Sequence, residues 1–151
     1  MEIKIVKASY KHIPHLAKNI RKEDVQELYD YAMLLPTQAL LQSLHNSKKA
    51  WTGTVDDVPV CMFGVVDSLK DVGCVWLIGT DDIHIYAKRF LSLNKRMIPV
   101  MMNGYKRLEN YVGAGNKRSI DWLVWLGFTF GKPEPKGPFN KMFIPFWMEK
   151  K

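Results

Sequence analysis

The chain has 151 residues, of which 47% are hydrophobic and 25% charged, the ordinary balance of a globular protein. Its length predicts a single domain over residues 1–151, and no apolar run reaches the roughly 18 residues that a membrane-spanning helix needs. Residues 1–20 alternate charged and apolar side chains, unlike a signal peptide, so we expect the protein to stay in the compartment where it is made.

The formal net charge is +7, from 22 Lys and Arg against 15 Asp and Glu. This charge allows attraction to nucleic acid, to the phosphates of coenzyme A (CoA) or to an acidic protein surface, and does not choose between them. The basic residues form scattered pairs and no dense tract, so most are interpreted as solvated surface, and nucleic acid ranks last among the expected partners. The pairs are Arg21-Lys22, Lys48-Lys49, Lys88-Arg89, Lys95-Arg96, Lys106-Arg107 and Lys117-Arg118.

The N-terminal third predicts a strand followed by helices. Residues 1–7 alternate apolar and charged side chains, as in a half-buried strand, and Pro14 suits the first turn of a helix. Asp24 is predicted to cap a helix that carries apolar residues at helical spacing. Arg21, Asp24 and Glu27 are three residues apart, so they form either a solvated helix turn or a polar rim at a binding site. A further helix is predicted over residues 36–47.

The middle of the chain predicts strands and then a long helix. Residues 51–55 and 59–66 form a predicted hairpin whose turn carries Asp56 and Asp57, and residues 72–78 form a third strand. Residues 83–93 have helical character, and Pro99 is expected near the start of the long helix that follows. Cys61 and Cys74 lie in apolar runs without a CxxC pattern. They are therefore interpreted as buried free thiols in a reducing cytoplasm, with no metal site.

Residues 108–130 give the strongest local pattern, which reads as strand, turn, helix and strand. Asn116 is a good N-cap for a helix with apolar residues at helical spacing, and Gly127 suits the left-handed position at its end. Residues 131–138 are predicted to be an irregular loop. Residues 141–148 form a last strand, in which Pro145 indicates an edge position or a bulge.

Several pieces of the chain resemble a family of acetyltransferase-like proteins of tailed phages, which includes the internal virion protein A of short-tailed phages. The most specific pieces are residues 76–81 and 116–128, and the others are residues 19–27, 50–51, 63–65 and 108–112. The spacing of Asn116, Ser119 and Gly127-Phe128 is also similar to the second half of GCN5-related N-acetyltransferase (GNAT) domains. The resemblance covers nearly the whole chain. It implies a GNAT-like α/β fold, with a central mixed, mostly antiparallel twisted sheet flanked by helices, and a role in phage biology.

The resemblance implies acetyl-CoA as a possible cofactor, which a GNAT domain holds by a glycine-containing loop before a helix. Between Leu77 and Met102 the only glycine is Gly79, and Asp81 and Asp82 fall where the CoA diphosphate would arrive. We therefore expect acetyl-CoA to bind weakly or not at all. The family places a general-acid tyrosine seven residues after Asn116, where this chain has Leu123, which cannot donate a proton.

We expect a cleft between the strands that end at Ile78 and Val112. The candidate catalytic residues are Asn116, Glu27 and Thr80. The candidate cofactor contacts are Trp76, Ile78, Gly79, Thr80 and Asn116. The candidate contacts to a substrate or partner are Arg21, Asp24, Glu27 and Trp122, the last weighed against simple core packing. A base could come from Glu27, Asp24, Asp81 or His84, and no spacing singles one out.

Three functions stay open. The missing glycines and Leu123 favour a catalytically degenerate GNAT-fold protein that contacts other phage or host proteins during virion assembly or ejection. The alternative is an active acetyl-CoA-dependent N-acetyltransferase that modifies a host or phage amine. A nucleic-acid binder that relies on the +7 charge is the third. The expected location is the cytoplasm of an infected bacterium, with association to the virion as a further expectation.

Overall fold

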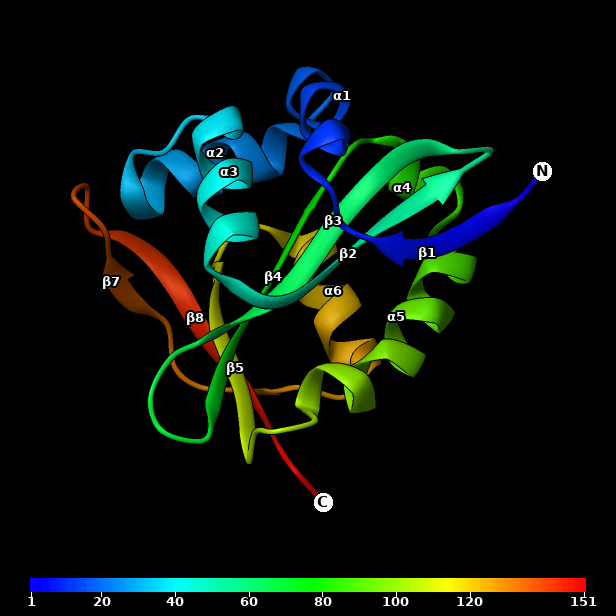
Figure 1. The fold of residues 1–151 in the computed structure, drawn as a ribbon. Helices are drawn as coiled ribbons and strands as arrows, with labels where there is room; N and C mark the ends of the chain where they lie inside the picture. The colour runs from blue at the N-terminus through cyan, green and yellow to red at the C-terminus, as the bar shows by residue number, and fades with distance from the viewer.

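The computed structural model describes all residues, 1–151, and consists of one twisted sheet flanked by helices (Figure 1). The strands are β1 (Ile3–Lys7), β2 (Ser47–Val55), β3 (Val58–Asp67), β4 (Val72–Gly79), β5 (Arg107–Gly113), β6 (Thr129–Phe130), β7 (Glu134–Lys136) and β8 (Lys141–Glu149). The helices are the short 3-10 helix η1 (Tyr10–His12), α1 (Ile13–Lys18), α2 (Lys22–Ala32), α3 (Pro36–Asn46), α4 (Asp82–Ile85), α5 (Ala87–Met102) and α6 (Lys117–Leu126). None of the helices is long and apolar enough to cross a membrane.

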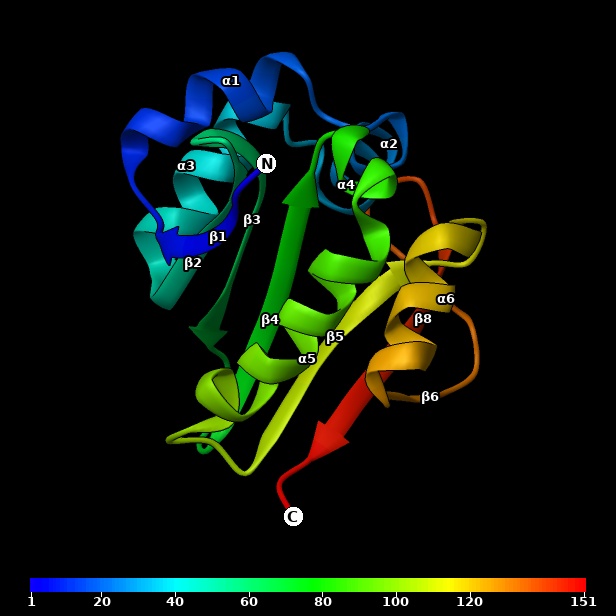
Figure 2. The same ribbon diagram turned by 90° about the vertical axis from the view of Figure 1, so that its right-hand side faces the viewer.

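The sheet has the order β1-β2-β3-β4-β5-β8-β6, and β7 also pairs with β8. Every pair of neighbouring strands is antiparallel except β4 and β5, which are parallel. Helices α1 to α3 lie on one face of the sheet and α5 and α6 lie on the other (Figure 2). The predicted mixed, mostly antiparallel sheet flanked by helices is confirmed.

Each face of the sheet has its own core. On the α5–α6 face, Phe90 from α5 and Leu108 from β5 are completely buried within the larger cluster. On the other face, Leu16 from α1 and Leu40 from α3 pack with Met62 and Ile78 of the sheet. Successive side chains of β3 and β4 point to opposite faces of the sheet, so these two strands contribute residues to both cores.

Three local features predicted from the sequence are confirmed: a proline in the first turn of a helix, a hairpin turn, and the residues at the two ends of α6. Pro14 lies in the first turn of α1. Asp56 and Asp57 both have positive φ, 47° and 67°, which is the backbone of a tight hairpin turn between β2 and β3. Asn116 caps α6, since its side chain accepts the Ser119 N–H, and Gly127 ends that helix at φ 101°.

The prediction that Asp24 caps a helix is wrong. Helix α2 begins at Lys22, two residues earlier, and Arg21 is its N-cap. The Asp24 side chain is therefore one turn inside the helix, where it is 5% exposed and paired with Arg21. The ion pair uses the oxygen atoms that a cap would have offered to the backbone.

Three predictions for the second half are also corrected. Pro99 lies inside α5, three residues before its end, because burial of Phe90, Met101 and Met102 along this helix outweighs the single backbone hydrogen bond that proline removes. The expected loop over residues 131–138 contains β7. Pro145 is not on an edge strand, since β8 pairs with β5 on one side and with β6 and β7 on the other. Pro145 lies between the part of β8 that pairs with β6 and the part that pairs with β7. No hydrogen bond of the sheet is therefore lost because proline has no N–H.

Candidate functional site

The strands β4 and β5 separate along their length, and this opening is the centre of the candidate site (Figure 2). They pair only between residues 72–74 and 107–109. At the next position the side chain of Asn110 donates to the Val75 carbonyl and bridges the widening gap. Beyond this bridge, main-chain groups that would join two parallel strands face an open space.

The pairing of β4 with β3 decides which main-chain groups face the opening. Thr80 donates its N–H to the Val60 carbonyl, and the register places Ile78 opposite Met62. Because antiparallel strands bond at every second residue, the N–H and C=O groups of Leu77 and Gly79 point away from β3. Both residues therefore present a donor and an acceptor to the opening.

The first two turns of α2 and its N-cap Arg21 form hydrogen bonds with the ends of both separated strands. At the end of β4, the Asp24 carboxylate accepts the Gly79 N–H at 2.8 Å, and the Arg21 N–H donates to the Gly79 carbonyl at 2.9 Å. At the end of β5, one oxygen of Glu27 accepts the Gly113 N–H at 2.6 Å and the Asn116 side-chain amide at 3.0 Å. One turn of α2 thus holds the two strand ends apart.

Arg21 and Asp24 form a buried bidentate ion pair. The guanidinium donates from Nη2 at 2.7 Å and from Nε at 3.0 Å, and each residue is 5% exposed. Burial raises the pKa of Asp24, while the Arg21 charge and the Gly79 N–H stabilise its ionised form. The pair is consistent with a structural role, because its hydrogen bonds all remain within the chain.

Glu27 lines the cavity, and one of its two carboxylate oxygens forms no hydrogen bond within the chain. Burial raises the pKa of Glu27, against the opposing effect of hydrogen bonds from Asn116 and Gly113. Its Oε1 carries both of these bonds, and Oε2 forms none. The close approach requires glycine at position 113, where an added Cβ would lie 2.8 Å from Oε1.

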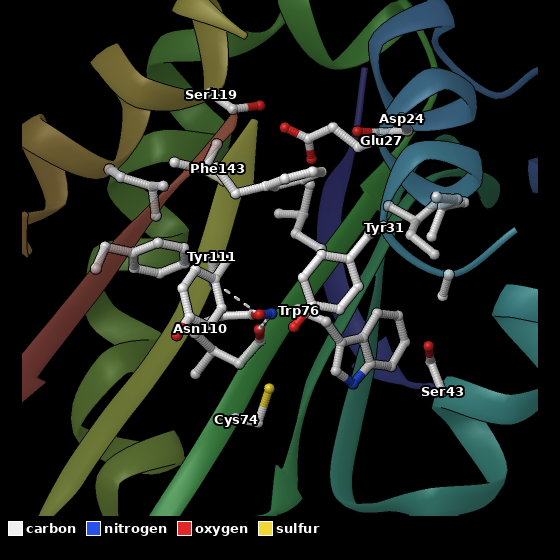
Figure 3. Close-up of a pocket in the computed structure, with 18 of the residues that line it drawn as sticks. Asp24, Glu27, Tyr31, Ser43, Cys74, Trp76, Asn110, Tyr111, Ser119 and Phe143 are labelled. Carbon is white, nitrogen blue, oxygen red and sulfur yellow. Dashed lines mark hydrogen bonds between the residues drawn. The ribbon is translucent and has the colours of Figure 1, made fainter. Parts of the chain in front are cut away.

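A cavity of about 400 Å³ fills the opening, and 17 of its 23 lining residues are hydrophobic. Tyr31 from α2, Trp76 from β4, Tyr111 from β5 and Phe143 from β8 point toward one another around it (Figure 3). Tyr31 packs edge-on against Phe143, with ring centroids 5.2 Å apart. The Trp76 ring is fixed by a hydrogen bond from Nε1 to the Ser47 hydroxyl at 2.8 Å.

The cavity passes through the sheet between β4 and β5. Ile78 and Trp76 belong to the core on the α1–α3 face. Leu77, Val75 and Trp122, which also line the cavity, belong to the core on the α5–α6 face. A ligand in this opening can therefore contact both helical layers.

The candidate residues divide into two groups. Those that line the cavity are Arg21, Asp24, Glu27, Trp76, Ile78 and Trp122. Gly79, Thr80 and Asn116 lie at its polar end without lining it. The Thr80 hydroxyl donates to the Val60 carbonyl, and the Asn116 amide is shared between Glu27 and the start of α6.

Three aromatic residues that line the cavity were not predicted from the sequence, and we call them the aromatic wall: Tyr31, Tyr111 and Phe143. Tyr31 lies four residues after Glu27, so helical spacing places both on one face of α2, and this signal was present in the sequence. Cys74 lines the cavity at a two-residue strand spacing from Trp76. Tyr111 and Phe143 reach the cavity from β5 and β8, and no local pattern links these two strands.

The cysteines and acids form no metal site. No group of three His, Cys, Asp or Glu residues is arranged to hold an ion. Cys61 is completely buried, which raises its pKa to about 12, and Cys74 is partly buried, which raises its pKa to about 11. Neither thiol is activated as a nucleophile at neutral pH.

Comparison of the fold with solved structures identifies acetyltransferases. Ard1 from Thermoplasma volcanium has 15% sequence identity and a TM-score of 0.78, with 100% of this chain and 99% of that chain covered. An N-acetyltransferase from Staphylococcus aureus Mu50 has 11% identity and a TM-score of 0.74, with both chains covered completely. The aminoglycoside acetyltransferase AAC(6')-Ib, solved with coenzyme A, has 9% identity and a TM-score of 0.69, covering 99% and 95%. No protein-family model and no curated protein sequence matches this chain.

The chain therefore has the GNAT fold. The family resemblance predicts that the CoA diphosphate would lie at the junction between β4 and α5. The junction is the short helix α4, which contains no glycine, and Asp81 and Asp82 are exposed there. Each carboxylate would repel a nearby phosphate by about 1 kcal/mol even in a water-like dielectric. Because of these two acids and the missing glycine, the residues of the junction itself do not fit a diphosphate, and the cations nearest to it are Lys88 and Arg89 in the first turn of α5.

Proposed function

We propose that this chain uses the GNAT fold as a binding module and does not transfer an acetyl group. The observation that carries the proposal is the hydrogen bonding of α2 to the strand ends. Asp24 and the Arg21 N–H satisfy both main-chain groups of Gly79, and Glu27 satisfies the Gly113 N–H. A ligand in the opening finds these main-chain groups already bonded, which leaves the Leu77 main-chain groups and the apolar walls as its contacts.

Two further observations support the absence of transfer. The β4–α5 junction does not fit a diphosphate, as described above. Leu123, at the position that the family resemblance gives to a general acid, lines the cavity with an apolar side chain and packs in the α5–α6 core. Proton donation to a leaving thiolate would need another group.

The surroundings of the cavity favour a protein partner. Large apolar side chains are exposed on α2, on the α2–α3 connection, at the turn between β7 and β8 and at the start of β8, and the Phe139 ring of that turn stacks on Tyr29 of α2. They are Tyr29, Met33, Leu35, Phe139 and Met142. Clustered exposed apolar residues indicate an interaction surface. We infer that the cleft receives an apolar segment of another phage or host protein, in virion assembly or ejection. The sequence resemblance supports the phage role, and with it a location in the infected cell or the virion.

Isothermal titration with acetyl-CoA and with CoA tests the first half of the proposal. We expect no binding at micromolar concentrations of either compound. Micromolar binding would overturn the proposal, because the cofactor would then have found contacts despite α4 and the bonded strand ends.

Photo-crosslinking during infection tests the protein partner. A benzoylphenylalanine at Tyr31, which is 41% exposed beside the cavity, should crosslink to one defined phage or host protein. The same group at Tyr10, which is 53% exposed and does not line the cavity, is the matched control. Equal crosslinking at both positions, or none at Tyr31, would contradict a partner in the cleft.

A second candidate, an active N-acetyltransferase, is favoured by one observation. The Leu77 main-chain groups face the opening beyond the last β4–β5 pair, and no bond to α2 covers them. A mass-spectrometric search for acetylated host and phage amines, with Asn116→Ala as the control, tests this candidate. Acetylation that depends on Asn116 would establish it in place of the binding module.

A further inference from the structure

The outer surface of the α5–α6 layer carries an excess of positive charge that the cleft does not use. Six Lys and Arg side chains lie on these two helices against a single acid, Asp121. Residues 10–46, which form the opposite helical layer, have four Lys and Arg against four Asp and Glu. Helices α5 and α6 therefore carry a net charge of +5, which becomes +3 when Asp81 and Asp82 at the adjoining α4 are counted. The six basic residues are Lys88, Arg89, Lys95, Arg96, Lys117 and Arg118.

The basic pairs that are scattered along the sequence lie close together in the folded protein. Three basic pairs that are separated by up to 30 residues of chain lie on two helices that contact each other. All six side chains are exposed, and none forms a salt bridge within the chain. Their charges are therefore available to an external anion.

The two helices meet along a seam at which Lys95 of α5 contacts Trp125 of α6, and helical spacing assigns Lys88 of α5 and Arg118 of α6 to the same seam. The two residues on each helix are seven positions apart, so they lie on the same edge about two turns, or roughly 10 Å, from each other. The Lys95 ammonium is 4.6 Å from the centre of the Trp125 ring. Because α5 and α6 run side by side in the same direction, Lys88 and Arg118 lie toward the other end of the seam (Figure 2).

The exposed ring of Trp125 favours an anion that also carries an aromatic base. The Trp125 ring is 48% exposed, next to Val124 at 58%, on a helix that otherwise buries its apolar residues. An exposed aromatic ring beside unpaired cations offers a stacking surface for a nucleobase together with contacts for the phosphates. Bases are free to stack in this way in a single strand and are already stacked in a duplex. The nearest acids are the Asp81-Asp82 pair at α4 and Asp121, which lies between Arg118 and Trp125 on the same edge of α6 and offsets one of the positive charges.

We propose that the α5–α6 seam binds single-stranded nucleic acid, with phosphates at Lys88, Lys95 and Arg118 and a base on Trp125. This surface is separate from the cleft and does not depend on the function proposed for it. It revises the expectation from the sequence that nucleic acid ranks last among the partners, since that expectation rested on the scattering of the basic pairs.

Fluorescence anisotropy with a labelled oligothymidylate of about 20 nucleotides, between about 50 and 200 mM salt, tests the proposal. We expect binding that weakens steeply with salt, by a slope of about 0.7 for each phosphate contact. Lys88→Gln with Lys95→Gln should reduce that slope by about 1.4. Trp125→Ala should weaken binding about 5- to 100-fold and leave the slope unchanged, because it removes stacking and no charge.

The matched control is Lys11→Gln with Lys18→Gln, which removes the same charge from the opposite helical layer, where both lysines are exposed. An equal loss of affinity in this control would mean that net charge alone attracts the oligonucleotide, and would overturn the proposal. So would an absence of binding at the lowest salt, an unaffected Trp125→Ala variant, or tighter binding of a duplex, of polyglutamate or of phosphatidylserine vesicles. Trp76→Ala, within the cleft, should leave oligonucleotide binding unchanged.

Discussion

Replacing Asp24 by asparagine tests whether the buried ion pair holds α2 against the strand ends. Asparagine keeps the size of the side chain and an oxygen for the Gly79 N–H, and removes the negative charge. Arg21, which is 5% exposed, would then be buried without its partner. Breaking a buried pair in this way costs about 3–5 kcal/mol of unfolding free energy. For a chain of 151 residues this corresponds to a fall in melting temperature of about 6–20 °C.

Urea denaturation and thermal melting of Asp24→Asn, Arg21→Met, their double variant and the control Asp30→Asn measure the effect. Asp30→Asn, on the same helix at a more exposed position, is the matched control and should change the unfolding free energy by less than about 0.5 kcal/mol. In a double-mutant cycle, Arg21→Met combined with Asp24→Asn should lose about 2–3 kcal/mol less than the two single losses together, because neither charge is left unpaired. A loss below about 1 kcal/mol for Asp24→Asn, or an equal loss for Asp30→Asn, would refute the structural role of the pair.

Three more outcomes follow from the same structure. Burial raises the pKa of Glu27 above its ordinary 4.5, so its carboxyl contributes stability below that pH that is lost as the pH rises through the raised pKa. The unfolding free energy of Glu27→Gln relative to the native protein should therefore increase from pH 4.5 toward neutrality in urea titrations. Gly137 has φ 74°, and an added Cβ would lie 2.2 Å from a carbonyl of α2, so Gly137→Ala should lose about 1–3 kcal/mol. With its pKa raised to about 12 and its side chain completely buried, Cys61 should react with a thiol reagent at pH 8 only on unfolding, whereas Cys74, which lines the cavity with its pKa raised to about 11, should react slowly in the folded protein.

Each of these outcomes has its own control. A relative stability of Glu27→Gln that stays flat or falls with pH would contradict the raised pKa. Gly104 has φ 93° with no atom within 4 Å of an added Cβ, so Gly104→Ala isolates the backbone strain, and a loss as large as that of Gly137→Ala would exclude the contact with α2. Rapid labelling of Cys61 in the folded protein would show that its strand opens locally.

Local signals were sufficient for most of the architecture. The alternation of residues 1–7, the paired aspartates of the hairpin turn, and the cap and end of α6 at Asn116 and Gly127 each act within a few residues of chain. Interactions over a few residues do not depend on the rest of the fold, so the sequence alone determined these elements. The mixed sheet was implied by the resemblance to GNAT domains and not by these local signals.

Contacts between distant residues decided the rest. Asp24 reads locally as a helix cap, and it becomes a buried partner of Arg21 because Gly79, 55 residues away, is brought to it. Glu27 meets Gly113 across 86 residues. Pro99 is tolerated inside α5 because the packing of the whole helix outweighs one lost hydrogen bond.

The two surfaces proposed to bind partners depend on the tertiary structure in the same way. The aromatic wall of the cleft combines Tyr31, Tyr111 and Phe143 from three elements, and the basic pairs become one surface only where α5 and α6 lie together. Residue type and spacing determined which elements could form. Which side chains share a space was decided by the packing of those elements, since burial and charge act through distance in three dimensions and not along the chain.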